Sequence, residues 1–119
     1  MDLGFDGRTA LVGGASSGLG RASATALAAE GCRLAIWSRQ REGLEAVSAD
    51  LRERYGTDVT ILEGDAAQPE TGRRIAAEAV ATLGTVDIVV LNAGGPPPAD
   101  PTATDAAGWA RAFQLLAVT

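Results

Sequence analysis

The sequence contains neither histidine nor lysine, and its single cysteine is Cys32. Without histidine, the histidine-based catalytic triads and zinc sites are excluded. One cysteine cannot form an internal disulfide, and no cluster of metal ligands is visible, so we predict no metal site. Aromatic residues make up 4% of the chain, whereas alanine and glycine are abundant. Such small residues suit close packing of helices on a sheet.

The charge balance and the hydrophobic runs exclude two further classes. The formal net charge is −5, and no stretch is basic enough for a nucleic-acid surface. No run approaches the roughly twenty apolar residues of a membrane-spanning helix. The first ten residues lack the charged-then-apolar pattern of a secretory signal. We therefore expect a cytoplasmic protein of one domain, with no nucleic-acid or membrane partner.

The most informative stretch is TALVGGASSGLG, residues 9–20. An apolar run typical of a buried strand passes through glycines into helix-forming residues. Such a junction presents free backbone N–H groups at the positive end of a helix dipole, which favours a phosphate. We predict a positive φ at Gly14, close approach of a phosphate at Gly18, and close packing of helix on strand at Gly20. Ser16 and Ser17 can cap the helix. A flexible Gly/Ser loop without a ligand is the alternative.

Strand and helix patterns alternate along the rest of the chain and predict an α/β fold. We expect strands at 9–13, 33–37, 58–62 and 87–92, and helices at 18–30, 42–55, 69–83 and 105–118. Strand–helix–strand units of this length place the strands parallel. A doubly wound sheet of order 3-2-1-4 results, with four of the six strands of a dinucleotide-binding fold, so it is incomplete on its C-terminal side.

Two predictions concern the packing of the C-terminal third. Residues 88–91 are uniformly apolar, so we expect a central strand covered on both faces. The helix at 105–118 carries an apolar stripe that we expect to pack on the sheet and, beyond it, on a partner subunit. The stripe consists of Trp109, Ala112, Phe113 and Leu116. The three prolines at 96–98 predict a stiff loop over the mouth of a cleft, rather than an SH3-domain ligand.

Ser38 and Arg39 follow the second predicted strand. In many dinucleotide folds an acidic residue at this distance from the glycine loop binds the ribose hydroxyls. A carboxylate would repel a 2′-phosphate, whereas a serine beside an arginine accepts one through a charge-assisted contact. We therefore predict NADP(H) in preference to NAD(H). Arg41 either assists Arg39 in binding the 2′-phosphate or is a solvated loop charge. In the alternative interpretation, Arg39 is also a solvated loop charge.

Two further segments end at the carboxyl edge of the predicted sheet, where ligands bind in such folds. Asp65 and Ala66 follow the third strand, and the fourth is followed by Asn92, Ala93 and Gly94. Asp65 either accepts a hydrogen bond from an amine of a ligand or caps the next turn. The small residues after Asn92 leave room for a ring or a ribose, or simply end the strand. We expect Asn92 to tie neighbouring loops together rather than to react.

The loop VGGASSGLG and the later LNAG, residues 91–94, resemble the two signature motifs of the short-chain dehydrogenase/reductase family. The family loop, T-G-x-x-x-G-x-G, has threonine where this chain has Gly13. The resemblance covers essentially the whole chain and implies that residues 1–119 are the N-terminal, NAD(P)-binding Rossmann part of such an enzyme. It also implies that Asp65 contacts the adenine amino group. The candidate cofactor-binding residues are Gly14, Ser16, Ser17, Gly18, Leu19, Gly20, Ser38, Arg39, Asp65, Ala66, Asn92, Ala93 and Gly94.

The catalytic residues of the family have no counterpart in this chain. Its only tyrosine, Tyr55, is followed four residues later by Val59, so the Tyr-x-x-x-Lys pair is absent. Carbonyl reduction needs a phenol that protonates the oxygen, with a lysine that lowers its pKa. We therefore expect a chain without catalytic residues that is inactive alone. The resemblance implies that the complete enzyme is a homo-oligomer that transfers hydride between nicotinamide and a small carbonyl or alcohol substrate. The alternative is a non-catalytic nucleotide-binding or interaction module.

Overall fold

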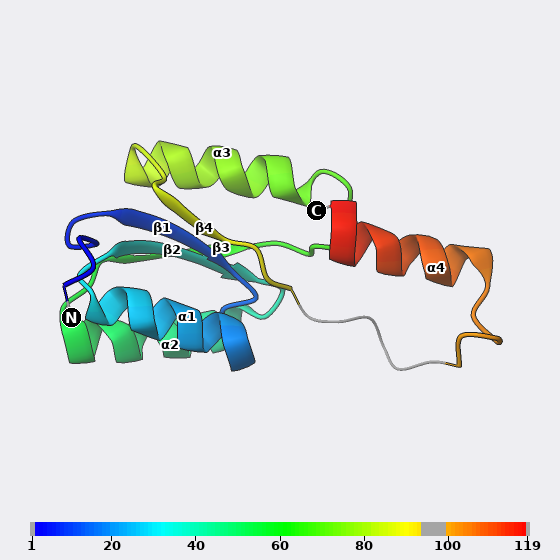
Figure 1. Cartoon of the computed structure of the whole chain (residues 1–119), viewed down its shortest axis with the longest axis horizontal. Helices are drawn as coiled ribbons and strands as arrows, with labels where there is room; N and C mark the ends of the chain where they lie inside the picture. Colours follow the sequence, from blue (N-terminus) through cyan, green and yellow to red (C-terminus); the bar gives the residue numbers. More distant parts are fainter. Residues whose placement is uncertain (1, 94–99, 119) are drawn as a thin grey trace.

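The structure, a computed structural model, describes residues 2–93 and 100–118. Strands and helices alternate along the chain (Figure 1). The elements are β1 (Thr9–Gly13), α1 (Gly18–Ala29), β2 (Arg33–Ser38), α2 (Arg41–Tyr55), β3 (Val59–Glu63), α3 (Thr71–Leu83), β4 (Ile88–Val90) and α4 (Ala106–Phe113), which continues as a π-helical turn, Gln114–Val118.

The four strands form one parallel sheet in the order β3-β2-β1-β4, which confirms the predicted order. Helices α1 and α2 lie on one face of this sheet and α3 lies on the other (Figure 1). The sheet is therefore doubly wound, and all four strands end at the same edge. Because that edge is where parallel α/β sheets bind ligands, the arrangement places the predicted site residues together.

Side chains of β2 alternate between the two halves of the core. Leu34 and Ile36 are fully buried among residues of α1 and α2, whereas Ala35 and Trp37 face α3. Apolar stripes of α2 and α3, with residues spaced three and four apart, supply the other side of each half. Their buried members are Leu44, Val47 and Leu51 of α2 and Ile75, Ala79 and Leu83 of α3. This two-sided burial is the main apolar contribution to the stability of the fold.

Among helices α1 to α3 and strands β1 to β3, the start of α3 differs most from the prediction. The helix begins at Thr71 rather than at Pro69, because residues 65–71 form hydrogen-bonded turns first. The N–H group of Gln68 donates to the carbonyl oxygen of Asp65 at 3.0 Å, and that of Thr71 donates to the carbonyl oxygen of Gln68 at 3.2 Å. The other boundaries of helices α1 to α3 and strands β1 to β3 lie within one residue of the expected positions.

Both packing predictions for the C-terminal third were wrong for the described residues. Strand β4 has three residues and lies at the edge of the sheet, with Val89 54% exposed. Helix α4 lies beyond the carboxyl ends of the strands (Figure 1) and has no buried residue. The stripe side chains Trp109, Phe113 and Leu116 are 55% to 65% exposed, because no described element covers them. The contact with a partner subunit stays a prediction, and the prolines at 96–98 lie outside the described residues.

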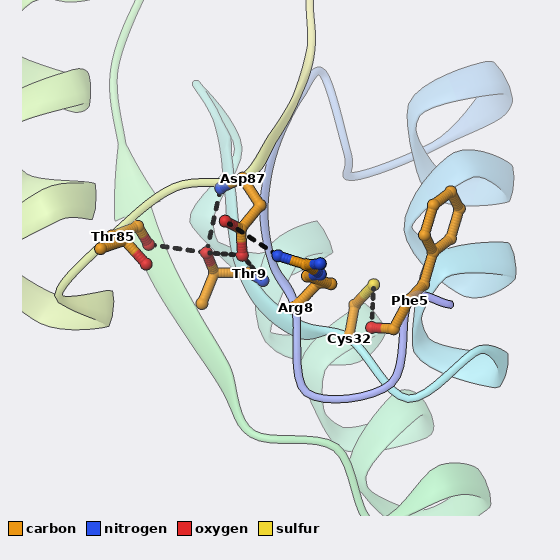
Figure 2. Close-up of polar contacts among 6 residues, drawn as sticks. All are labelled: Phe5, Arg8, Thr9, Cys32, Thr85 and Asp87. Atoms are coloured by element: carbon orange, nitrogen blue, oxygen red, sulfur yellow. Dashed lines mark hydrogen bonds and ion pairs between the residues drawn. The ribbon is translucent and has the colours of Figure 1, made fainter. Parts of the chain in front are cut away.

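A polar clasp joins the amino ends of β1 and β4 (Figure 2). The Thr9 N–H donates to Asp87 Oδ2 at 3.0 Å, and the Asp87 N–H donates to Thr9 Oγ1 at 3.1 Å. The Thr9 hydroxyl donates in turn to the carbonyl oxygen of Thr85 at 2.7 Å. The hydrogen bonds from Thr9 lower the pKa of the Asp87 carboxyl, with a further contribution from Arg8, whose Nη1 lies 3.9 Å from Oδ1. The clasp anchors an edge strand that pairs with β1 alone among the described strands.

Among the described helices, none combines the length and the hydropathy needed to cross a bilayer.

Candidate cofactor site

The glycine turn between β1 and α1 has the conformation that the sequence predicts. Gly14 and Gly18 have φ values of +59° and +57°, in the left-handed region that side chains disfavour. A Cβ atom on Gly20 would collide with the carbonyl oxygen of Gly14. The positive φ at Gly14 and the close packing at Gly20 are thus confirmed. Helix α1 starts directly against the end of β1.

The amino end of α1 is open for a ligand. Ser17 occupies the N-cap position in an extended conformation, but its side chain makes no capping hydrogen bond, so the capping role expected of the serines was wrong. The first turn of α1 contains no acidic residue, so the positive end of the dipole is not compensated there. A Cβ atom on Gly18 would meet no atom within 4 Å. The backbone N–H groups of this turn are therefore accessible to an anion.

A cleft of about 1010 Å³ opens over this turn and over the ends of the neighbouring strands. Its volume lies at the upper end of the roughly 300–1,000 Å³ usual for small-molecule sites. Eleven of the thirteen candidate residues line it. They are Gly14, Ser16, Ser17, Gly18, Leu19, Ser38, Arg39, Asp65, Ala66, Asn92 and Ala93. Gly20 lies beneath the turn rather than in the wall of the cleft, and Gly94 lies outside the described residues.

Ser38 and Arg39 lie at the rim of the cleft, where β2 leads into α2. Ser38 is 9% exposed, and its Oγ accepts a hydrogen bond from the N–H of Gln40 at 3.1 Å, which fixes the turn. Arg39 is exposed and has no ion pair or hydrogen bond with another residue in the described ranges. Arg41 is engaged elsewhere, because its Nε donates to Glu45 Oε1 at 3.2 Å, one turn along α2. Arg39 is thus the arginine of this turn that is open to a ligand.

Asp65 caps the turn after β3, as the alternative interpretation predicts. Its Oδ1 accepts a hydrogen bond from the Ala67 N–H at 2.9 Å. The same residue lines the cleft, beside Ala66, which is 5% exposed. Capping uses Oδ1, so the geometry is also compatible with a ligand at Oδ2. The contact between Asp65 and an adenine amino group stays a prediction.

Asn92 ties the end of β4 to the glycine turn, which confirms the role expected for it. Its Nδ2 donates to the carbonyl oxygen of Gly13 at 3.2 Å. A Cβ atom on Gly13 would lie 2.5 Å from the carbonyl oxygen of Asn92 and 3.0 Å from Nε1 of Trp37. Glycine in place of the threonine of the family loop therefore permits a close approach of three strand ends.

The sequence did not predict that several further residues line the cleft. Trp37 reads as an ordinary member of β2, and its size is the one signal that distinguishes it from its apolar neighbours. Trp109 and Arg111 reach the cleft from α4, whose position relative to the sheet follows from no local pattern. Gln40, Gly64 and Ala67 belong to turns next to predicted residues. A metal site is absent from the described ranges, where no three potential ligands cluster.

Comparisons with known proteins agree with this geometry. The family model described as short chain dehydrogenase matches residues 8–117. L-rhamnose 1-dehydrogenase (NAD(P)(+)) of Sphingomonas sp. (strain SKA58) is 39% identical over 90 residues, which are 76% of this chain and 35% of that protein.

Solved structures show the same similarity at the level of the fold. The structure of L-sorbose reductase from Gluconobacter frateurii, complexed with NADPH and L-sorbose, has a TM-score of 0.91 and 31% identity, and the match covers 98% of this chain and 44% of that one. The structure of a short-chain dehydrogenase from Sphingobium yanoikuyae in complex with NADPH has a TM-score of 0.81 and 29% identity. That match covers 91% of this chain and 42% of the other. The chain thus spans less than half the length of these relatives. It belongs to the short-chain dehydrogenase family, a family of oxidoreductases.

Proposed function

We propose that residues 1–119 are the NADP(H)-binding part of an oxidoreductase that transfers hydride between nicotinamide and a carbonyl or alcohol substrate. One observation carries this proposal: the uncapped amino end of α1 and the unpaired Arg39 line the same cleft. The first suits a pyrophosphate and the second a phosphate on the adenosine ribose. A ligand with both groups is a 2′-phosphorylated dinucleotide.

The residues of the glycine turn fit the pyrophosphate. Side chains at Gly14 and Gly18 would need a strained backbone, and one at Gly18 would project into the space where a phosphate approaches. Ser16 and Ser17 add hydroxyl groups to the same wall, and both line the cleft. Leu19 is 79% exposed at the cleft, so its side chain offers an apolar contact for the nicotinamide end of the ligand.

The second and third strand ends suit the adenosine half. Arg39 offers its guanidinium to the 2′-phosphate, while Ser38 holds the turn that presents it. Asp65 and Ala66 line the adjoining wall and are proposed to contact the adenine. The L-sorbose reductase and the Sphingobium enzyme were both solved with NADPH, which supports this choice of cofactor, whereas the name of the L-rhamnose dehydrogenase allows NAD or NADP.

Asn92, Ala93 and Gly94 are proposed to support the ribose nearer the nicotinamide. Asn92 holds the glycine turn against the end of β4, and Ala93 leaves the cleft wall free of a bulky side chain. When the cofactor is bound, its nicotinamide ring supplies or accepts the hydride. The residues of this chain bind and orient the dinucleotide, and the proton donor to the substrate oxygen would come from elsewhere in the complete enzyme.

Titration calorimetry with NADP⁺ and NAD⁺ tests the proposal. We expect the purified protein to bind NADP⁺ more tightly than NAD⁺, and the variant Gly14→Val to bind neither, because a β-branched residue is strained at φ +59° and its Cβ would lie 2.6 Å from Asn92 Nδ2. Circular dichroism would verify that the variant keeps its helices. Unchanged affinity of a folded Gly14→Val variant would refute the assignment of the pyrophosphate site.

A further inference from the structure

Trp37 lies in a row of residues at the carboxyl edge of the sheet. The strand register pairs it with Gly13 of β1 on one side and with Leu62 of β3 on the other. Trp37 and Leu62 are partly buried on the α3 face of the sheet, where Ile75 belongs to the core. The indole thus stands between the end of β1, which begins the glycine turn, and the end of β3, which leads to Asp65.

The indole ring of Trp37 lies next to Gly13. Its Nε1 and Cε2 atoms lie 3.0 Å and 3.1 Å from the position that a Cβ atom on Gly13 would take. The side chain of a threonine at this position, as in the family loop, would overlap sterically with the indole. The glycine at 13 and the tryptophan at 37 are therefore complementary in size: the ring fills volume that the missing side chain leaves.

The indole packs against the core on the α3 face and also borders the ligand cleft. Trp37 lines the cleft together with Ser38, Arg39 and Asp65. Trp37 is half-buried, and within the described part of the chain its indole N–H makes no hydrogen bond, so this donor is available to a ligand. A rigid aromatic surface with one free donor, next to an arginine and a carboxylate, has the properties of a wall that recognises a nucleoside.

We propose that Trp37 contacts the adenosine half of the bound dinucleotide as a specificity-determining residue. The inference rests on the proposed cofactor function. Trp37 directly precedes Ser38 and Arg39, the residues assigned to the 2′-phosphate, and β3 beside it leads to the residues assigned to the adenine. The ring stabilises the adenosine by apolar contact and by its N–H, and it holds the end of β1 in place from the α3 side.

Tryptophan fluorescence tests this contact, because the chain has two tryptophans, Trp37 and Trp109. In the variant Trp109→Phe, all tryptophan emission comes from Trp37. We expect 2′,5′-ADP, which carries the adenosine half and does not absorb the emitted light, to quench or shift this emission. Nicotinamide mononucleotide, which lacks that half, should leave it unchanged at equal occupancy. Calorimetry on the same samples establishes the occupancy.

Affinity provides the second readout. The variant Trp37→Phe keeps a ring but loses the N–H, and we expect 2′,5′-ADP to bind about three- to tenfold more weakly, the range of one lost hydrogen bond. Phe113→Leu, at an exposed aromatic residue that does not line the cleft, is the control and should bind 2′,5′-ADP as the unmodified protein does. Thermal unfolding separates a loss of fold from a loss of contact. Because Trp37→Leu also removes the ring, we expect a larger loss of affinity from it.

The outcomes distinguish the inference from the function on which it rests. If the unmodified protein binds neither NADP⁺ nor 2′,5′-ADP, the proposed function itself fails. If it binds both, but Trp37 emission in Trp109→Phe does not respond and Trp37→Phe binds with full affinity, the cofactor function stands and the assignment of Trp37 is wrong.

Discussion

Asn92 and Gly13 approach each other so closely that position 13 leaves no room for a side chain. The amide of Asn92 donates to the carbonyl oxygen of Gly13 at 3.2 Å, and the carbonyl oxygen of Asn92 lies 2.5 Å from the position of a Cβ atom on Gly13. This contact joins the ends of β1 and β4, the two strands that carry the signature motifs. The glycine turn and the segment that begins with Asn92, both of which line the cleft, are thereby positioned together.

Gly13→Ala should separate these two strand ends. The added Cβ atom would meet backbone at Asn92 and the ring at Trp37, so we expect a loss of about 1–3 kcal/mol in the free energy of unfolding, the usual cost of overpacking. We also expect at least a tenfold weaker affinity for NADP⁺. Chemical denaturation and calorimetry measure the two effects. Asn92→Ala, which removes the hydrogen bond without adding atoms, should weaken affinity less, and equal affinity of Gly13→Ala and the unmodified protein would contradict this account.

Asp87 should make the stability of the sheet depend on pH in the acidic range. Its pKa in the folded protein lies below the ordinary value because Thr9 donates hydrogen bonds to the charged carboxylate. A carboxyl with a lowered folded pKa stabilises the fold above its unfolded pKa of about 3.9, and this contribution is lost as the pH falls through the folded pKa. Asp87→Asn should therefore lower Tm at pH 7 and make little difference at strongly acidic pH.

Thermal unfolding of both proteins across that range measures the effect. Asp58→Asn is the matched control, since Asp58 is largely exposed and its nearest cation, Arg33 Nε, lies 4.0 Å away. If Asp87→Asn lowers Tm by the same amount at neutral and at acidic pH, the clasp stabilises the fold independently of the charge on Asp87, which would contradict this prediction.

Cys32 should react slowly with thiol reagents in the folded protein. It is 1% exposed, and its Sγ donates to the carbonyl oxygen of Phe5 at 3.5 Å (Figure 2). Burial, followed by the nearby carboxylates of Glu30, Asp87 and Asp6, raises the pKa of the thiol and so depletes the reactive thiolate. We expect alkylation at pH 8 to be at least tenfold faster in denaturant. Equal rates would mean that the turn at the end of α1 is open in solution.

The 119-residue chain should bind the cofactor without reducing a carbonyl compound. Its one tyrosine, Tyr55, lies at the last residue of α2, the end remote from the cleft, and interacts with Arg54. The chain contains no lysine to lower the pKa of a phenol. Absorbance of NADPH followed in the presence of a ketone measures turnover. Oxidation of NADPH that depends on both the ketone and the purified chain would overturn this prediction.

Local sequence patterns were sufficient to predict most of the fold. The apolar runs of β1 and β2 and the three-and-four spacing on α2 each follow from short-range geometry, and the resulting order of strands is observed. The glycine turn was equally predictable, because the positive φ of Gly14 and the crowding at Gly20 are properties of a few consecutive residues. The role of Asn92 as a tie between loops was likewise foreseen from its place at a strand end.

What the sequence did not reveal depends on contacts between distant residues. The apolar stripe around Trp109 predicted burial, but periodicity alone does not say which element covers a stripe, and none of the described elements does so. Trp37 escaped notice because its importance follows from Gly13, a residue of the neighbouring strand. For Asp65, the sequence left a turn cap and a ligand contact open, and the observed cap leaves Oδ2 for the second role.

The affinity of Arg39→Ala for NADP⁺ and NAD⁺ tests the central claim most directly. Arg39 is the cleft arginine in this turn without a partner in the described ranges, whereas Arg41 is bound to Glu45 and serves as the matched control. We predict that Arg39→Ala loses about 1.5–3 kcal/mol of binding free energy for NADP⁺, the range of a lost charge-assisted contact, and keeps its affinity for NAD⁺. Arg41→Ala should leave both affinities unchanged. An equal loss for both dinucleotides, or no loss for either, would contradict the assignment of the cleft to a 2′-phosphorylated cofactor.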